Sequence, residues 1–166
     1  GLNSPLTSSM GRLFDAVSAL AGIRDDAMYE GQAAMDLEAR MDTAADGAYE
    51  FALAEGDPLI IDQAPVVTAI LDDLASGEVA SAISVRFHRA VVAMVAEVAA
   101  RACEATGRNE VAFSGGCFMN RYMLEHVPAA LRTRGLLPMT HLRLPVNDGG
   151  VSFGQMVVAI ARQRMV

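Results

Sequence analysis

Apolar residues recur at steps of three and four along most of the chain, a pattern typical of amphipathic helices. Several of these repeats begin after a capping residue or a proline and end at a glycine, as helices do. We therefore expect a helix-rich protein. The predicted helices are 10–20, 31–41, 65–76, 79–105, 117–134 and about 151–164.

Short strands are predicted between these helices. Residues 49–53 alternate in polarity, and residues 59–61 follow a Gly-Asp-Pro turn, so they are expected to be two strands joined by that turn. Residues 111–113 and 138–144 are predicted strands on either side of a helix. The order strand, glycine turn, helix, strand, glycine turn, helix favours a right-handed crossover unit in a parallel sheet.

Composition narrows the class of protein. The length of 166 residues, without repeats or low-complexity linkers, indicates a single domain over residues 1–166. A net charge of −7 argues against nucleic acid as a partner. All the basic residues are arginines, which excludes a lysine-dependent P-loop and a lysine Schiff base. Without a membrane-length apolar run or a signal-peptide pattern, we expect a cytoplasmic protein with no membrane partner. Because the first residue is Gly1, we expect a fragment of a longer protein.

Two glycine turns are the first candidates for a binding site. Gly115 and Gly116 follow one predicted strand, and Asp148 with two glycines follows the other. Ligands of parallel sheets bind beyond the carboxyl ends of strands, and glycine lets backbone N–H groups approach a phosphate. The alternative is that both turns only connect strand to helix. Asp148 is either a metal ligand or a helix cap, and Asn120 either faces a ligand or lies on the solvated surface.

Other reactive side chains favour structural roles. His88, His126 and His141 are too far apart in sequence for an HxxxH or HExxH pair, so we expect each to be structural. Cys117 follows the glycine pair but has no histidine close in sequence, and Cys103 fits helix packing. We assign no catalytic residue from the sequence.

Five segments, in order along the chain, carry a resemblance to a known family. They are SSMGRLFDA (8–16), YEGQAAM (29–35), FHR (87–89), SGGCFMNR (114–121) and PVNDGG (145–150), the last followed by Gly154 and Gln155. With these motifs the chain resembles, from end to end, the HypF family of carbamoyltransferases that mature [NiFe] hydrogenases. The nodulation- and antibiotic-type O-carbamoyltransferases are a related alternative.

The resemblance implies an α/β fold, namely the helix-rich C-terminal lobe of an actin/Hsp70/sugar-kinase-like (ribonuclease H-like) domain with a small mixed sheet. It also implies an enzyme that uses ATP and carbamoyl phosphate through carbamoyl-adenylate. The carbamoyl group then passes to the C-terminal cysteine of a HypE-type partner. The acceptor and the remaining N-terminal domains of the same parent protein are therefore the expected partners.

Site residues carry over from the family one at a time. Asp15 matches a position that holds the nucleotide ribose, and Gly31 lies in a segment that lines the nucleotide. Asp36 matches a further acidic contact, more weakly. These three are implied to be nucleotide-binding.

The glycine turns carry the other matches. Gly115 and Gly116 match the phosphate turn, Asn120 an asparagine that reaches the nucleotide, and Asp148 the aspartate that binds a divalent metal. The family's HxxxH metal pair and its adenylate-forming domain are missing from this sequence. We therefore expect the fragment alone to be inactive and its metal site to be completed by residues outside it.

Further hypotheses stay open beside the transferase. The chain could be a nucleotide-binding module without transfer activity, or a structural helical domain that docks partners. Its apolar surface, exposed where another lobe would pack, predicts self-association.

Overall fold

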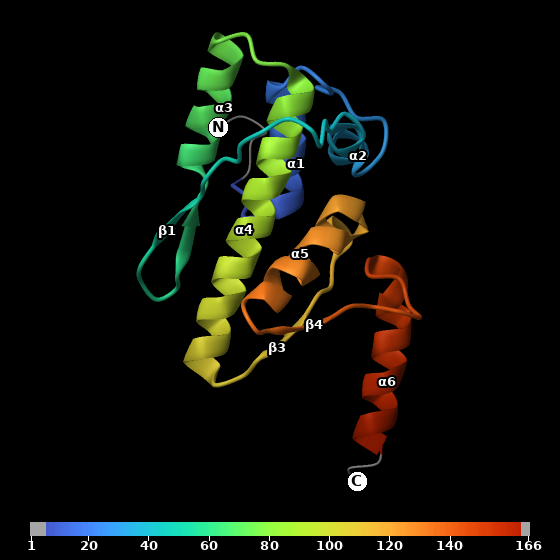
Figure 1. Ribbon diagram of the computed structural model, residues 1–166. Helices are drawn as coiled ribbons and strands as arrows, with labels where there is room; N and C mark the ends of the chain where they lie inside the picture. The colour runs from blue at the N-terminus through green and yellow to red at the C-terminus, as the bar shows by residue number, and fades with distance from the viewer. Residues whose placement is uncertain (1–5, 164–166) are drawn as a thin grey trace. The chain divides into compact units, whose positions relative to one another are not determined.

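Helices make up most of the computed structural model, which describes residues 6–163 (Figure 1). The helices are α1 (Met10–Leu20), α2 (Gln32–Ala39), α3 (Ala64–Ala75), α4 (Ala80–Thr106), α5 (Arg121–Thr133) and α6 (Val151–Gln163). The strands are β1 (Ala52–Ala54), β2 (Ile60–Asp62), β3 (Glu110–Ala112) and β4 (Leu137–Met139), and the two 3-10 turns are η1 (Gly116–Met119) and η2 (Asp148–Gly150). The chain divides into two compact units, Gly1–Glu97 and Val98–Val166, and α4 runs through the division.

The core of the first unit forms where α1 packs against α2 and α3. Phe14 of α1 meets Phe87 of α4 edge to face, with ring centroids 4.9 Å apart, and both side chains are buried. Aromatic rings dominate such cores because each removes a large apolar area from water. Other fully buried apolar side chains of this unit are Val17, Leu37, Val66, Ile70, Ile83, Val85 and Val91.

His88 belongs to this core and is fully buried. Its ring lies edge-on to Phe14, and its Nδ1 lies 2.8 Å from the carbonyl oxygen of Ser84. Burial lowers the pKa of His88, although the backbone bond to Ser84 acts in the opposite direction. These surroundings match the structural role expected for His88.

The second unit is built around a parallel strand pair connected by a helix. β3 pairs with β4 in parallel, with Val111 opposite Pro138, and α5 connects the two strands. α5 packs on β4 through an apolar face. Its buried residues are Met123, Val127, Pro128 and Leu131. The predicted parallel crossover is thus confirmed in its pairing.

Predicted and observed helices agree closely except at the start of α5, which begins at Arg121 and not at residue 117, because residues 116–119 form the 3-10 turn η1. α1 spans the predicted 10–20, and α4 begins and ends one residue later than predicted. The last helix was predicted to end near Arg164, which lies outside the described residues; as described, α6 ends at Gln163. The small mixed sheet is divided between two separate two-stranded sheets, antiparallel β1–β2 in the first unit and parallel β3–β4 in the second.

The predicted strand 138–144 is wrong over most of its length. β4 ends at Met139, and the chain then turns, so that the Val146 carbonyl accepts a hydrogen bond from the Gly115 amide. The reason is that β3, the strand β4 pairs with, has only three residues. The apolar residues after Met139 therefore do not extend β4; Leu142, for example, is exposed.

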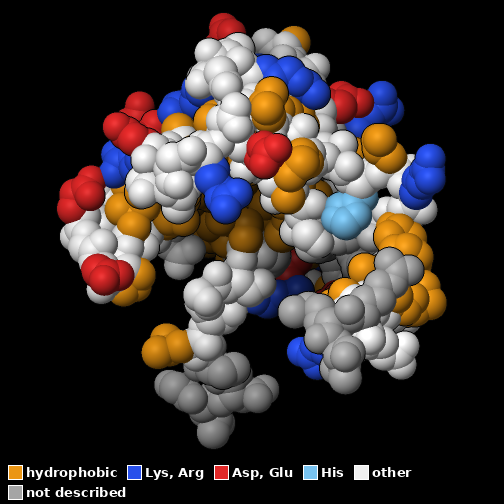
Figure 2. Space-filling view, turned by 90° about the horizontal axis from the view of Figure 1, so that it is seen from below, with side chains coloured by type: hydrophobic (Ala, Val, Ile, Leu, Met, Phe, Trp, Pro, Cys, Tyr) orange, Lys and Arg blue, Asp and Glu red, His pale blue; other side chains and the backbone are white. Residues whose placement is uncertain are grey.

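No helix within residues 6–163 is both long enough and apolar enough to cross a membrane. Apolar side chains nevertheless reach the surface, where Figure 2 shows them among the charged ones. Large exposed examples are Met28, Met35, Ile60, Met119, Leu142, Phe153, Met156 and Val158. Single exposed apolar residues are ordinary, but α6 is exposed along its whole length.

Candidate functional site

An open cavity of about 460 Å³ lies in the first unit beside the start of α1. It is lined by Ser9, Arg12 and Asp15 around the start of α1 and by residues 27–31, the end of the α1–α2 loop. The structure therefore brings together two of the predicted nucleotide-binding residues, Asp15 and Gly31.

Asp15 presents a partly exposed carboxylate to this cavity. It follows Arg12 by three residues on α1, so the two side chains share one helix face and form a 2.9 Å ion pair. About a quarter of the Asp15 side chain is exposed. A carboxylate with free lone pairs at a cavity wall can accept hydrogen bonds from a hydroxylated ligand.

Gly31 shapes the part of the cavity wall that the α1–α2 loop forms. It is the residue before α2 and has φ of +80°, a left-handed conformation that glycine adopts without strain. The backbone reverses here, and the side chain of Gln32 accepts a hydrogen bond from the amide of Met28 through Oε1 at 2.7 Å. The wall from Met28 to Gly31 is thus held by α2 itself.

Asp36, the third predicted residue of this unit, does not line the cavity. Its Oδ2 accepts a 2.5 Å hydrogen bond from Nε of Arg24 within an ion pair. Arg24 lies in the same loop between α1 and α2, and its amide also bonds to the Ser18 carbonyl. The contact that the structure gives to Asp36 therefore ties this loop to α2.

In the second unit the two predicted glycine turns lie side by side. The Gly115 amide donates a 2.8 Å hydrogen bond to the carbonyl oxygen of Val146, just before the second turn. Gly115 has φ of +106°, which again favours glycine. A Cβ on Gly150 would come within 2.8 Å of the Pro145 carbonyl oxygen, so no side chain fits there without a backbone shift.

Asn120 acts as the cap of α5. Its Oδ1 accepts a 2.9 Å hydrogen bond from the amide of Met123, and Met123 is buried. Part of the Asn120 side chain is therefore committed to the helix start. The sequence placed Asn120 within the first turn of that helix, and the structure places it one step earlier, at the cap.

Asp148 is exposed at the first position of η2. Its neighbour Asn147 caps η2, since Asn147 Oδ1 accepts a hydrogen bond from the Gly149 amide at 3.2 Å. Within residues 6–163 no group of three or more His, Cys, Asp or Glu side chains could hold a metal ion. One carboxylate is too few ligands for a divalent cation, so the described residues do not by themselves fit a metal.

A smaller apolar cavity of about 180 Å³ lies next to the joined turns in the same unit. Phe113 and Phe118 line it, with ring centroids 5.0 Å apart. Its other lining residues are Leu124, Thr140, His141, Leu144 and Val146. Such a cavity can take a flat apolar group.

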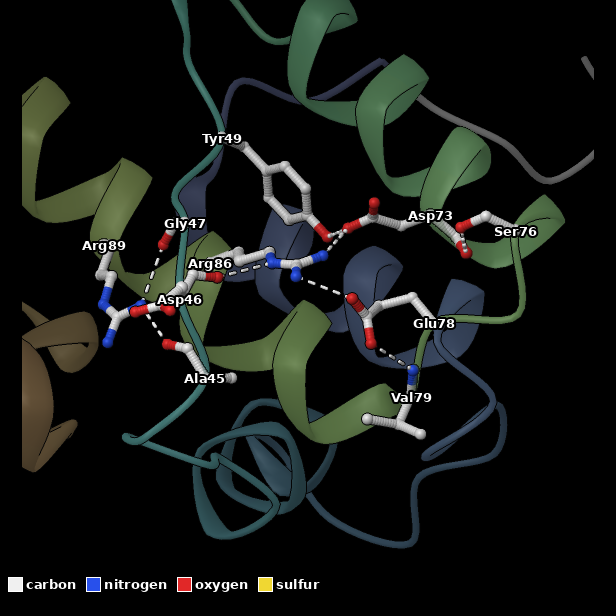
Figure 3. Close-up of polar contacts among 10 residues, drawn as sticks. All are labelled: Ala45, Asp46, Gly47, Tyr49, Asp73, Ser76, Glu78, Val79, Arg86 and Arg89. Carbon is white, nitrogen blue, oxygen red and sulfur yellow. Dashed lines mark hydrogen bonds and ion pairs between the residues drawn. The ribbon is translucent and has the colours of Figure 1, made fainter.

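Sequence reasoning missed a polar network in the first unit (Figure 3). The Arg86 guanidinium pairs with Asp73 at 2.6 Å and with Glu78 at 2.7 Å. Tyr49 donates its hydroxyl to the same Asp73 at 2.6 Å. Burial alone would raise the pKa of Asp73, but the bonds from Tyr49 and Arg86 outweigh it and lower that pKa.

Arg89 holds the neighbouring segment. Its guanidinium donates to the carbonyl oxygens of Thr43, Ala45 and Gly47 (Figure 3 shows the last two). Arg86 also donates to a carbonyl of this segment, that of Asp46. The two arginines thus fasten the irregular stretch before β1 to α4. The only signal in the sequence was their spacing of three residues, about one helical turn, with Arg86 directly before the Phe-His-Arg motif and Arg89 as its last residue.

Comparison with protein families gives one match over most of the chain. Residues 1–155 match the model described as "Carbamoyltransferase, Kae1-like Domain, second subdomain". A similar curated protein is carbamoyltransferase HypF of Rhizobium leguminosarum bv. viciae, 40% identical over 161 residues. HypF of Synechocystis sp. is 37% identical over 163 residues. In both cases the alignment covers 96% of this chain and 20% of the relative, so the chain spans about a fifth of their length.

Solved structures agree with this match. Full-length HypF in a phosphate- and nucleotide-bound form superposes with a TM-score of 0.87 and 41% sequence identity. HypF of T. kodakarensis gives a TM-score of 0.79 and 26% identity. Each match covers 92% of this chain and 20% of the solved chain.

Proposed function

Because the chain belongs to the HypF family of carbamoyltransferases, we propose that it forms the nucleotide-binding part of a carbamoyl transfer site. The observation that carries this proposal is the hydrogen bond between Gly115 and Val146, which joins the two glycine turns at one edge of the second unit. Gly115, Gly116 and Gly149 are exposed, so their backbone can approach phosphate oxygens without obstruction by Cβ atoms.

Further residues of the proposed set lie in each unit, Asp15 and Gly31 in the first and Asn120 in the second. Asp15 accepts hydrogen bonds from the ribose hydroxyls, and Gly31 allows the backbone of the cavity wall to come close to the ligand. Asn120 contributes its side-chain amide beside the first glycine turn. Full-length HypF in a phosphate- and nucleotide-bound form superposes on this chain, which supports the proposal that the chain binds a nucleotide.

The transfer itself needs positioning more than a strong enzyme nucleophile. In the proposed step, the thiolate of a C-terminal cysteine on a HypE-type acceptor attacks the carbonyl carbon of carbamoyl-adenylate. A C–S bond forms, the bond from that carbon to the phosphate oxygen breaks, and AMP leaves with the electron pair. The residues described here hold and align the adenylate, which lowers the entropic part of the barrier.

We further propose that Asp148 contributes one ligand to a divalent metal whose other ligands lie outside this chain. The exposure of Asp148 beside the joined turns supports this, as does the capping of η2 by Asn147, which leaves the Asp148 carboxylate available for a ligand.

Isothermal titration of the chain with ATP and with AMP tests nucleotide binding. Asp15→Asn removes the charged acceptor at nearly constant shape, and we expect about tenfold weaker binding from the loss of a charged hydrogen bond. Asp72→Asn on α3 is the matched control and is expected to leave the affinity unchanged. Equal affinities for all three proteins would refute the assignment of Asp15, and no binding by the unmodified chain would refute the nucleotide site.

A chimaera tests the transferase role. In the Rhizobium relative, the matching fifth is replaced by this chain, and carbamoylation of a cysteine-tailed acceptor peptide is followed by mass spectrometry. Transfer that depends on Asp148 supports the proposal. A chimaera that binds ATP but never modifies the acceptor leaves the nucleotide-binding module as the better description.

A further inference from the structure

The end of the α1–α2 loop is a cavity wall without regular secondary structure. Residues 27–31 line the cavity together with Asp15 and lie between α1 and α2. Met28 and Tyr29 are 88% and 55% exposed, so their side chains are free to contact a ligand in the cavity. A wall of this kind binds well only if its backbone is held in place before the ligand arrives.

The buried side chain of Gln32 fixes the backbone of this wall. It is the first residue of α2, yet its polar side chain is buried, with 9% exposed. Its Oε1 accepts the Met28 amide at 2.7 Å, four residues back along the chain. The left-handed turn at Gly31 is what directs the chain back over the helix start.

The start of the same loop is fixed separately. The amides of Ile23 and Arg24 both bond to the Ser18 carbonyl, and the Arg24 side chain pairs with Asp36. The bond from Gln32 therefore acts on the cavity-lining half of the loop, and the contacts of Arg24 act on the half that does not line the cavity.

We infer that Gln32 is a positioning residue, which sets the nucleotide affinity of the cavity by fixing the wall from Met28 to Gly31 without contacting the ligand. This inference rests on the nucleotide site proposed above. Without the buried acceptor oxygen of Gln32, the Met28 amide must form its hydrogen bond with water instead, and the wall shifts toward the solvent.

Two substitutions separate the hydrogen bond from the packing. Gln32→Met keeps the length of the side chain and removes the acceptor. Gln32→Glu keeps an oxygen at the same position. Gln63→Met, at the exposed residue before α3, is the matched control for the chemical change.

Hydrogen exchange of the Met28 amide gives a readout that needs no ligand. We expect exchange about fivefold faster in Gln32→Met and near-normal exchange in Gln32→Glu and Gln63→Met. By calorimetry we expect AMP to bind about fivefold more weakly to Gln32→Met, with affinity restored in Gln32→Glu. A role in stability alone would lower the melting temperature without this pattern of rescue.

The outcomes are distinct. Unchanged Met28 exchange in Gln32→Met overturns the inference, and so does AMP affinity equal to that of the unmodified chain once exchange is faster. If the unmodified chain binds no AMP, both the proposed nucleotide site and the inference about affinity fail. Faster Met28 exchange in Gln32→Met would then still support the role of Gln32 in fixing the wall. Should Gln32→Met not fold, Gln32→Asn withdraws the acceptor by one methylene and is read in the same way.

Discussion

The amide of Gly115 and the carbonyl of Val146 are 2.8 Å apart, donor to acceptor, although 31 residues separate them in the chain. This bond places the turn after β3 against the turn before α6. The second turn leaves no room for a side chain at Gly150, since a Cβ there would lie 2.8 Å from the carbonyl oxygen of Pro145, the residue before Val146. A side chain at Gly150 would therefore disturb the segment that places Val146 against Gly115.

Gly150→Ala is predicted to damage nucleotide binding more than folding. The new Cβ would meet the Pro145 carbonyl oxygen at 2.8 Å, and the backbone must shift at a cost of about 1–3 kcal/mol. Titration with ATP should show at least severalfold weaker binding, while circular dichroism keeps its helical signal. Gly154→Ala in α6, whose Cβ would meet nothing within 4 Å, is the control and should not reduce affinity. Equal effects of the two substitutions would contradict the prediction.

The helices were predictable because the residue pattern that indicates each helix lies within or next to that helix. α1 shows its apolar face every three or four residues within its own eleven positions, and the serines before it and Gly22 after it indicated its ends. The same holds for α4. Parallel pairing of β3 and β4 also followed from order along the chain, since a helix between two strands favours a crossover.

What the sequence did not predict depends on distant contacts. β4 stops at Met139 because its partner strand is short, which no local pattern records. The Arg86–Asp73 pair joins α4 to α3, and only the folded chain reveals it. In the candidate site, the meeting of Asp15 and Gly31 was expected from a resemblance, whereas the bond from Gln32 to Met28 was not foreseen.

Asp73 should make stability depend on acid pH. Its pKa is lowered in the folded protein below its ordinary value of 3.8, so the unfolded chain takes up a proton first as the pH falls. The contribution of Asp73 is therefore complete above pH about 4 and is lost as the pH falls through the lower, folded-state value. Urea unfolding between pH 6 and 2 should show a shallower decline for Asp73→Asn than for the unmodified chain.

Tyr49→Phe provides the control for this measurement. It removes the hydroxyl that donates to Asp73 but leaves the Arg86 ion pair. We expect an intermediate pH dependence and a loss of about 1 kcal/mol at neutral pH. Identical pH profiles for Asp73→Asn and the unmodified chain would rule out Asp73 as a source of acid sensitivity.

His88 should add a second, milder pH dependence. Burial lowers its pKa below the ordinary value of 6.5, because the folded state disfavours the charged imidazole. Stability is complete above the unfolded pKa and declines as the pH falls below about 6.5, toward the folded-state value. His88→Asn keeps a donor for the Ser84 carbonyl and removes the titration. At pH 8 the free energy of unfolding of His88→Asn should be lower than that of the unmodified chain, but it should change less between pH 7 and 5. An equally steep change in both proteins would exclude His88 as the source of this pH dependence.

The surface of α6 leads to the last prediction, that this chain associates with copies of itself. All thirteen residues of α6 are exposed, among them Phe153, Met156, Val157 and Ile160, which share one side of the helix. An isolated helix of this length is marginal in water, and an apolar face stabilises it only when covered. Sedimentation velocity across a hundredfold concentration range should show reversible association. Val157→Arg should reduce it, and the control Gln155→Arg on the same helix should not. A single monomeric species at every concentration would contradict the prediction.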